Sequence, residues 1–415
     1  MTDRQFPQIS ELRHLLRPRK PVLDPARRRL ARAFTIEDLR RIAARTVPRS
    51  VFDYVDGAAE SEISISRSRS AFEALEFHPA VLKDVSTLNP SVTVLGKPST
   101  QPFVLAPTGF TRMMHHHGET AVAQVAERAG IPYVLSTMGT TSIEDVAQAS
   151  PSARKWFQLY VSRDRELSAS LMRRAEKAGY EALMLTVDVP VGGARMRDAR
   201  NGFGFPPSLG LRTFIDGALH PAWTFNMLTT KPLAFASMSE SAADVGRHMQ
   251  KLFDPAMTLD DLAWIRANWN GPIIVKGVQT VADAVRLADA GVQGIVLSNP
   301  GGRQLDRAPV PLRILPNVVD AVGDRVEISV DTGIMTGADI VACLALGARY
   351  VLVGRAYLYG MMAGGKPGAE KAVNILTGEI ARTMALLGVT CTSELNHNHV
   401  GLPLPADVAA EKVLS

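Results

Sequence analysis

The sequence predicts a closed (β/α)8 TIM barrel, preceded by a helical segment and interrupted by one long insertion after the fourth strand. Eight short, β-rich apolar segments follow residue 100. Amphipathic, helix-like segments separate most of them, and strands that alternate with helices indicate a parallel sheet. The length of 415 residues can accommodate one such barrel with additions. An open doubly wound sheet is the alternative, but no Gly-x-Gly-x-x-Gly motif follows an early strand.

The chain before the barrel divides into an arm and two helices. Residues 1–32 are rich in Pro and Arg, and we expect them to form a basic, extended arm. Thr35 can cap a helix that has Asp38 in its first turn and that runs through Ala43. A second helix should carry the apolar residues of 51–55.

The barrel domain is predicted to span residues 33–400. Its strands are expected at 103–106, 133–136, 156–160, 183–187, 273–275, 294–297, 326–330 and 350–353, with helices that include 122–129, 166–178, 281–290 and 338–346. Residues 189–268 form one long excursion. Because loops of this length in compact domains are usually functional or mobile, we predict a lid. Residues 401–415 should form a C-terminal tail that packs on a neighbour or frays.

Composition limits the functional class. The apolar content of 46% and the charged content of 21% are typical of a soluble globular protein. The formal net charge of +5 is concentrated before residue 50. A basic arm can contact anionic lipid or nucleic acid but is more often a solvated tail. The N-terminus has no apolar signal region, and no run of about 18 apolar residues could span a bilayer. We expect a cytoplasmic protein, with peripheral contact at the inner membrane face as an alternative and no nucleic-acid partner.

One loop carries the strongest chemical signal. Its sequence is Ser298-Asn299-Pro300-Gly301-Gly302-Arg303-Gln304-Leu305-Asp306, directly after a predicted strand. The two glycines allow a tight turn and a close approach to a ligand. The guanidinium of Arg303 provides a fork of donors that suits a carboxylate. The loop therefore favours an acid-binding site, although an ordinary loop with a solvated arginine would explain this stretch alone.

Polar residues at or just after the ends of successive strands predict one shared pocket, because the carboxyl ends of parallel strands meet on one face. These residues are Pro107, Thr108, Gly109, Ser136, Gln158, Tyr160, Thr186, Asp188 and Lys276. A lysine at the mouth of a barrel needs a negative partner, which could be a flavin or a carboxylate. Asp331-Thr332-Gly333 and Gly354-Arg355 follow the last two strands, where barrels usually bind phosphate.

These motifs resemble those of the FMN-dependent 2-hydroxy-acid oxidoreductases, which include glycolate oxidase, mandelate dehydrogenase and L-lactate dehydrogenase. The resemblance covers roughly residues 33–400 and is closest to the actinobacterial L-lactate dehydrogenases. It implies an oxidoreductase with an FMN cofactor, a small carboxylate substrate oxidised at its α carbon by transfer to flavin N5, and a homotetramer. The electron acceptor could be oxygen, a quinone or a carrier protein.

The resemblance also implies residue roles. Substrate binding falls to Tyr54, Tyr160, Arg195 and Arg303, and catalysis to Tyr160, Asp188, Lys276 and position 300. The FMN contacts would be Pro107, Thr108, Gly109, Ser136, Gln158, Thr186, Lys276, Ser298, Asp331, Gly333, Gly354 and Arg355. The family commonly has a further phosphate-binding arginine where this chain has Met335, which weakens the expected grip on phosphate.

Position 300 is the main departure from the family. The family has Ser-Asn-His-Gly-Gly-Arg-Gln-Leu-Asp, with the His as catalytic base, and this chain has Pro300 instead. Proline has no titratable group, and loss of a general base typically slows a reaction ~10²–10⁴-fold. Asp188, which would hold that histidine, also loses its partner.

Three explanations of Pro300 remain. The chemistry could be shifted, with Asp188 as the base or with an amine, a peptide or another natural product as the substrate. The chain could be an FMN-binding protein with little catalytic activity. It could also be an altered lactate dehydrogenase. Our leading hypothesis is a flavin oxidoreductase for a 2-hydroxy-acid-like or 2-amino-acid-like substrate, with poor turnover of L-lactate.

No metal site is predicted. His115, His116 and His117 are adjacent in sequence, and adjacent histidines point in different directions and seldom chelate one ion. His397 and His399 are similarly weak candidates. The two cysteines, Cys343 and Cys391, do not form a close-spaced metal or redox motif, and we expect both to be small buried residues.

Overall fold

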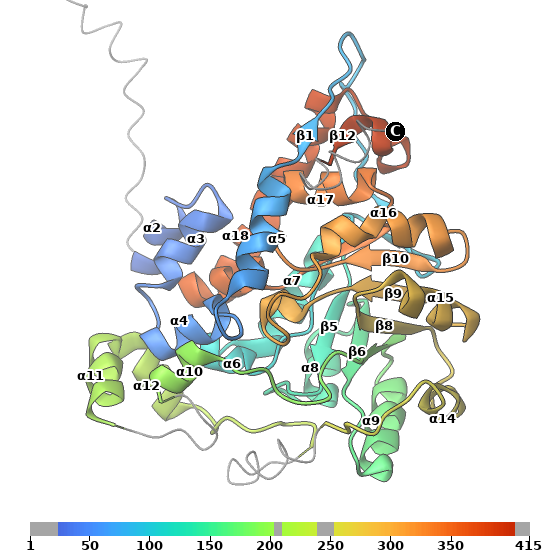
Figure 1. Ribbon diagram of the computed structural model, residues 1–415. Coiled ribbons are helices and arrows are strands. Elements are labelled where there is room, and N and C mark those ends of the chain that lie inside the picture. The colour runs from blue at the N-terminus through green and yellow to red at the C-terminus, as the bar shows by residue number, and fades with distance from the viewer. Residues whose placement is uncertain (1–23, 203–209, 239–252, 403–415) are drawn as a thin grey trace, which may run out of the picture.

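The computed structural model describes residues 24–202, 210–238 and 253–402. Eight parallel strands close into a barrel at the centre of the molecule, which confirms the predicted fold (Figure 1). In their order around the barrel they are β10 (Glu327–Val330), β11 (Tyr350–Val353), β4 (Phe103–Leu105), β5 (Tyr133–Ser136), β6 (Lys155–Leu159), β7 (Ala182–Thr186), β8 (Ile273–Val278) and β9 (Gly294–Leu297). Each predicted strand segment overlaps one of them.

The barrel strands are nearly continuous apolar runs because both faces of the barrel wall are buried. Alternate residues point inward, and a separate core cluster forms there around Trp156, Met184 and Ile274. The hairpin of β2 (Val92–Val94) and β3 (Lys97–Ser99) adds Val94 to this cluster. Because side chains fill the interior, a ligand can bind at an end of the barrel but not inside it.

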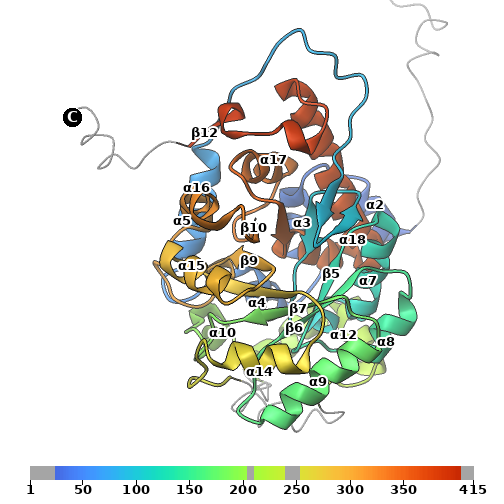
Figure 2. The same ribbon diagram turned by 90° about the vertical axis from the view of Figure 1, so that its right-hand side faces the viewer.

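Helices surround the strands, with α15 and α16 on one side and α7 and α8 on the other (Figure 2). After β4 comes the short α6 (Thr111–Met114), and the outer helices are α7 (Gly118–Ala129), α8 (Ile143–Ala149), α9 (Arg165–Lys177), α14 (Asp261–Asn268), α15 (Val281–Asp289), α16 (Pro311–Val322), α17 (Gly337–Ala345) and α18 (Arg355–Leu387). All the predicted outer helices are present. Four begin at a side-chain cap, with Ser142, Asp164, Thr280 or Thr336 accepting a backbone N–H bond from three residues ahead.

The N-terminal helices are α2 (Pro25–Leu30), α3 (Ile36–Ala43), α4 (Arg49–Asp56) and α5 (Ile63–Glu73). Thr35 and Asp38 form the predicted capping box of α3, and α4 covers the predicted second helix. The prediction of an extended arm through residue 32 is wrong for α2. Asp24 caps this helix, a proline starts it, and Leu30 is buried beside Gly364 of α18. The arm before residue 24 lies outside the described residues.

The described part of the insertion contains helices as well as loops. They are α10 (Met196–Arg200), α11 (Leu211–Leu219) and α12 (Pro221–Thr229), followed by α14 near the end of the insertion. Helix α10 packs on α4, and α11 and α12 lie at the edge of the molecule (Figure 1). After the 3₁₀ turns η3 (Thr392–Glu394) and η4 (His397–His399), β12 (Val400–Gly401) pairs with β1 (Glu76–Phe77). The predicted tail beyond residue 402 lies outside the described residues.

Candidate active site

A cavity of about 820 Å³ opens where the barrel strands end. It brings together almost all the residues predicted from the sequence. Those that line it are Tyr54, Pro107, Thr108, Gly109, Ser136, Gln158, Tyr160, Thr186, Asp188, Arg195, Lys276, Pro300, Arg303, Asp331, Gly333, Gly354 and Arg355. The exception is Ser298, which is fully buried behind the wall and whose Oγ lies 2.8 Å from the Nζ of Lys276.

Two polar side chains in the cavity wall each have a hydrogen-bonding atom without a partner among the described residues. The Nε2 of Gln158 and the Oγ1 of Thr186 are buried and have no hydrogen-bond partner among the described residues. The Oγ of Ser136 donates to the Oε1 of Gln158 over 3.0 Å, which fixes the direction of the amide. A buried polar atom without a partner costs about 1–3 kcal/mol. These two side chains are therefore suited to the polar edge of a bound ligand.

Lys276 is held by carboxylate and hydroxyl oxygens. Its Nζ lies 2.8 Å from the Oδ2 of Asp331 and 2.8 Å from the Oγ of Ser298. Burial lowers the pKa of Lys276, but Asp331 and Asp188 outweigh burial and raise it. The lysine is therefore a fixed cation in the cavity wall.

Asp188 is a buried carboxyl group without a protein partner. Both of its oxygens are buried and have no hydrogen-bond partner among the described residues. Its side chain packs against Gly277, where an added Cβ would lie 2.4 Å from the carboxyl carbon. Burial raises the pKa of Asp188, Lys276 opposes the rise and Asp331 adds to it, and the resulting pKa is about 7. The group therefore titrates near neutral pH, which is the property that a general base needs.

The backbone at Pro300 has an unusual conformation. Pro300 has φ of +26°, whereas the pyrrolidine ring prefers φ of about −65°. The Oδ1 of Asn299 accepts from the N–H of Gly302, and the N–H of Gly301 donates to Thr332, so bonds on both sides hold the turn. Asn, Asp and His are enriched among non-glycine residues with positive φ. The turn therefore suits another residue better than proline.

The substrate end is built around the ring of Tyr54. The Cζ of Arg303 lies 4.8 Å from the ring centroid and the Cζ of Arg195 lies 5.5 Å from it. The Nη1 of Arg303 donates to the carbonyl oxygens of Tyr54 and Gly57. Burial, and then the nearby Arg195, lower the pKa of Arg303 to about 10. No carboxylate among the described residues forms an ion pair with Arg303, so this end of the cavity favours an anion.

Tyr160 lies between the substrate end and Asp188. Its ring packs edge-on against Phe253, with the centroids 5.1 Å apart. Burial, with an added contribution from Asp188, raises the pKa of Tyr160 well above its ordinary value. Its hydroxyl group therefore stays protonated and can donate a hydrogen bond.

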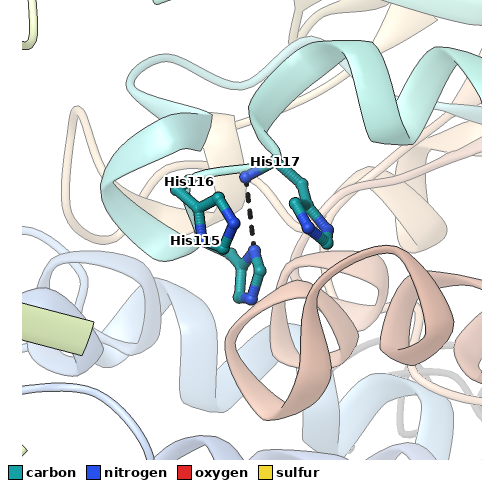
Figure 3. A group of neighbouring side chains, drawn as sticks. All are labelled: His115, His116 and His117. Atoms are coloured by element: carbon teal, nitrogen blue, oxygen red, sulfur yellow. Dashed lines mark hydrogen bonds between the residues drawn. The ribbon is translucent and has the colours of Figure 1, made fainter. Parts of the chain in front are cut away.

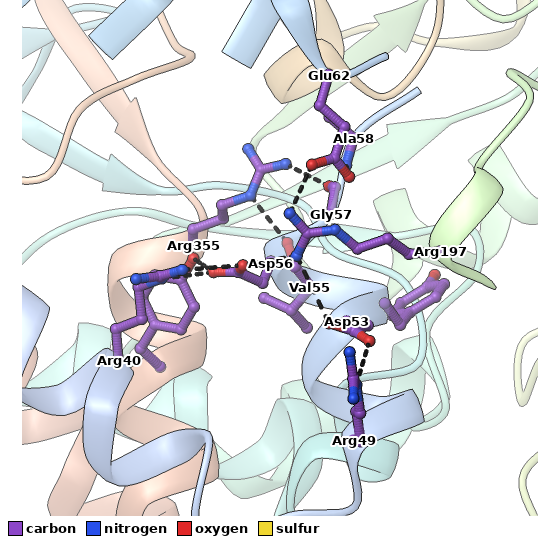
Figure 4. A network of polar contacts seen from close by, with 12 residues as sticks. Arg40, Arg49, Asp53, Val55, Asp56, Gly57, Ala58, Glu62, Arg197 and Arg355 are labelled. Carbon is purple, nitrogen blue, oxygen red and sulfur yellow. Dashed lines mark hydrogen bonds and ion pairs between the residues drawn. The ribbon is translucent and has the colours of Figure 1, made fainter. Parts of the chain in front are cut away.

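A network of arginines and carboxylates holds the insertion against α4 (Figure 4). Arg197 of α10 donates to the Oδ2 of Asp56 over 3.0 Å and to the Oε2 of Glu62 over 2.5 Å. Arg40 of α3 binds the same Asp56 over 2.6 Å. The network places Arg195, at the start of α10, beside Tyr54. The sequence does not predict this network, because each of its charged residues lies in a different segment of the chain.

The side chain of Arg355 is engaged differently from the prediction. Its Nε donates to the carbonyl oxygen of Val55, and its Nη2 donates to that of Gly57 (Figure 4). The Nη2 also donates to the carbonyl oxygen of Gly301. Two of its three nitrogen atoms thus hold the backbone near the substrate end. Its backbone N–H, in the first turn of α18, remains suited to a phosphate.

The three adjacent histidines converge, contrary to the expectation that they point in different directions (Figure 3). Their ring centroids lie 4.4 Å apart. However, the Nδ1 of His115 accepts from the N–H of His117, and the Nδ1 of His117 accepts from the N–H of Lys366, each over 3.3 Å. In a neutral ring this leaves the proton on Nε2, where a metal would need a lone pair. These bonds occupy one ring nitrogen each of His115 and His117, and the Nδ1 of His116 has no partner among the described residues.

The remaining weak candidates lie outside the cavity lining. His397 and His399 belong to η4, where the Nδ1 of His399 accepts from the N–H of Asn396. Cys343 is fully buried, as predicted, and Cys391 is only partly buried.

Comparison with known proteins decides the family. A family model described as FMN-dependent dehydrogenase matches residues 43–402. The chain belongs to this family. A protein of Mycobacterium tuberculosis that is named provisionally as an L-lactate dehydrogenase is 55% identical over 398 residues, which cover 96% of each chain. An L-lactate dehydrogenase of Caulobacter vibrioides is 39% identical over 375 residues, which cover 89% of this chain and 97% of the relative.

Solved structures agree with this assignment. The crystal structure of the monotopic membrane protein (S)-mandelate dehydrogenase matches with a TM-score of 0.85 and 36% identity, and covers 90% of this chain and all of that chain. The protein is thus an α-hydroxy-acid oxidoreductase of the FMN-dependent family, and its cofactor is FMN. The cavity fits this cofactor. Gln158 and Thr186 have unpartnered polar atoms for a heteroaromatic ring, Lys276 supplies a cation, and the turns at Gly333 and Gly354 suit a phosphate.

Proposed function

We propose that this FMN-dependent dehydrogenase oxidises the α carbon of a small 2-hydroxy or 2-amino acid, with Asp188 as the base. The observation that carries the proposal is the carboxyl group of Asp188, whose two oxygens are buried at the cavity and have no partner in the described part of the chain. Position 300, where the family has its base, holds a proline without a titratable group. Asp188 is thus the group in this part of the cavity with a pKa near neutrality.

The chain's own residues can bind and orient such a substrate. Arg303 and Arg195, on the ring of Tyr54, provide the positive charge for its carboxylate. Tyr160 stays protonated and donates to the oxygen on the α carbon, or to the nitrogen there once Asp188 has taken a proton from the ammonium group. Ionised Asp188 takes the proton from that atom, and FMN supplies the acceptor for the two electrons.

Asp188 favours an amine substrate over an alcohol. A 2-amino acid carries a positive ammonium group at neutral pH, and a buried carboxylate attracts that group. The same attraction is absent for a neutral hydroxyl group. Peptides or other natural products that bear an amine remain alternatives, as does an FMN-binding protein with little catalytic activity. The homotetramer and the choice of oxygen, quinone or carrier protein as acceptor stay predictions from the family.

The test is anaerobic bleaching of the flavin absorbance by a panel of 2-hydroxy and 2-amino acids. We expect at least one 2-amino acid to bleach the flavin of the purified holoprotein, and L-lactate to bleach it slowly. Bleaching by L-lactate at the rate of the other panel members would contradict the proposal that Pro300 makes L-lactate a poor substrate. If FMN is bound and no compound bleaches it, the binding-protein alternative replaces the oxidoreductase.

We also propose that the helices α11 and α12 dock on a lipid membrane. Five large apolar side chains on them are exposed, namely Phe214, Ile215, Leu219, Phe225 and Leu228. Exposed apolar groups of this kind mark interaction sites. A similar solved structure is described as a monotopic membrane protein. Among the described residues no helix is long and apolar enough to cross a bilayer. Contact would therefore be peripheral, at the inner face of the cell membrane. It would favour a membrane quinone as the electron acceptor.

Flotation with anionic phospholipid vesicles tests this docking. The wild-type protein should float with the vesicles, and the double variant Phe225→Ser, Leu228→Ser should stay at the bottom of the gradient, because it removes the apolar area that enters the lipid. Leu386→Ser is the matched control, since Leu386 is 70% exposed but lies on α18. Docking through α11 and α12 is wrong if the double variant floats as well as the wild type.

A further inference from the structure

The end of the cavity at Gly333 and Gly354, where we expect the phosphate to bind, has few positive charges that are available to a ligand. Met335 stands where the family commonly has an arginine, and Arg355 has two of its nitrogen atoms committed to backbone carbonyls. Arg40 also lines the cavity, but it is paired with Asp56 and Glu37. Two carboxylates, Glu73 and Glu379, line the same region. A phosphate dianion there needs a cation from elsewhere in the chain.

Arg69 on α5 has spare donors at this place. Its Nη1 donates to the carbonyl oxygen of Gly333 and, over 2.8 Å, to the Oδ2 of Asp339. Its Cζ lies 5.7 Å from the centroid of the Phe72 ring. The Nε and Nη2 of Arg69 have no partner among the residues that the structure describes. The side chain is 29% exposed and lines the cavity, so these donors can reach a ligand.

The fold ties Arg69 to the loop that receives the phosphate. The Oδ2 of Asp339 accepts from the backbone N–H groups of Met335 and Thr336 as well as from Arg69. Gly333 has φ of +86°, and a Cβ there would lie 3.1 Å from the ring of Phe72. Helix α5 therefore packs directly on the turn, and Asp339 fixes one edge of the guanidinium.

We propose that Arg69 binds the phosphate of FMN and supplies the charge that Met335 lacks. This inference rests on FMN as the cofactor. The geometry of a guanidinium suits the role, because one nitrogen can hold Gly333 and Asp339 while the other two face the ligand as a fork. A lysine could not make both sets of bonds in fixed directions.

The test compares FMN with riboflavin, which lacks the phosphate. Full-length protein is freed of flavin, and each compound is titrated by fluorescence quenching. Arg69→Gln should weaken FMN binding roughly 10- to 100-fold, as expected for a lost charge-assisted bond, and leave riboflavin binding unchanged. The matched control is Arg67→Gln, on the same helix but exposed and outside the cavity, which should bind both compounds as the wild type does.

A second variant distinguishes binding of the FMN phosphate by Arg69 from structural support of the turn at Gly333. Adding Met335→Arg to Arg69→Gln should restore FMN affinity, because it returns a cation to the same phosphate. Equal weakening of both compounds by Arg69→Gln, or unchanged FMN binding, would overturn the proposal and leave Arg69 as a structural residue. Failure of the wild type to bind FMN would overturn it too, but through the cofactor assignment.

Discussion

Replacing Pro300 with histidine should raise the rate at which L-lactate bleaches the flavin by roughly 10²–10⁴-fold. We expect the imidazole to pair with Asp188, as the family resemblance implies, because both residues line the cavity and the two oxygens of Asp188 have no partner among the described residues. A carboxylate beside the ring fixes its tautomer and stabilises its protonated form, as in other acid–base pairs. The turn already has the left-handed backbone that histidine tolerates and proline does not. Stopped-flow absorbance under anaerobic conditions measures the rate.

Pro300→Asn is the control for the backbone. Asparagine also tolerates positive φ but cannot act as a base. Both variants should raise the melting temperature, because they release strain of the order of 1–3 kcal/mol. Only the histidine variant should gain activity with lactate. An equal gain with asparagine would mean that relief of the turn, and not a restored base, limits the reaction.

Replacing Asp188 with asparagine should slow flavin bleaching by the best native substrate roughly 10²–10⁴-fold, because the amide cannot take the proton. In the wild type the rate should rise with pH and level off above about 7, where Asp188 is ionised. The residual rate of Asp188→Asn should lack this step. Rates measured from pH 5 to pH 9 on the holoprotein give both profiles.

The same carboxyl group should affect stability. Its pKa of about 7 in the folded protein is above the unfolded value, so the folded state holds this proton more tightly. Wild-type stability should therefore fall as pH rises from about 4 to about 7, and level off above about 7. Relative to Asp188→Asn, the fall should be on the order of 2–3 kcal/mol between pH 5 and pH 8, in denaturant unfolding of the FMN-free chain.

Glu327→Gln is the matched control for Asp188→Asn. Burial also raises the pKa of Glu327, but this residue accepts from the N–H of Leu95 and does not line the cavity. Its replacement should leave the pH profile of the rate unchanged. If the rate of Asp188→Asn keeps the wild-type profile, another group is the base.

Much of the site could be predicted because it depends on local pattern. Each barrel strand is a short apolar run, and the polar residue at or near its carboxyl end is placed by the strand alone. Ser136, Gln158, Thr186 and Lys276 therefore met at one face once eight strands closed into a barrel. The capping box of Thr35 and Asp38 was equally local.

Other features depended on partners distant in sequence. The prediction for the arm failed at α2, where Asp24 and Pro25 are local helix-start signals and burial of Leu30 against α18 stabilises the helix. The guanidinium of Arg355 was expected to bind phosphate. In the structure it donates to the carbonyl oxygens of Val55 in α4 and of Gly301. The convergence of His115 and its neighbours depends on the turn before α7.

The sequence by itself determined the barrel, the end at which ligands bind and the absence of the family's base at Pro300. These follow from residue types and from periods of a few residues. Only the tertiary structure decided which polar atoms lack a hydrogen-bond partner. Among the described residues these include the oxygens of Asp188 and two nitrogens of Arg69. Whether a buried group has a partner depends on every neighbour that the fold brings to it, and the two partners of Arg69, for example, lie 264 and 270 residues away along the chain.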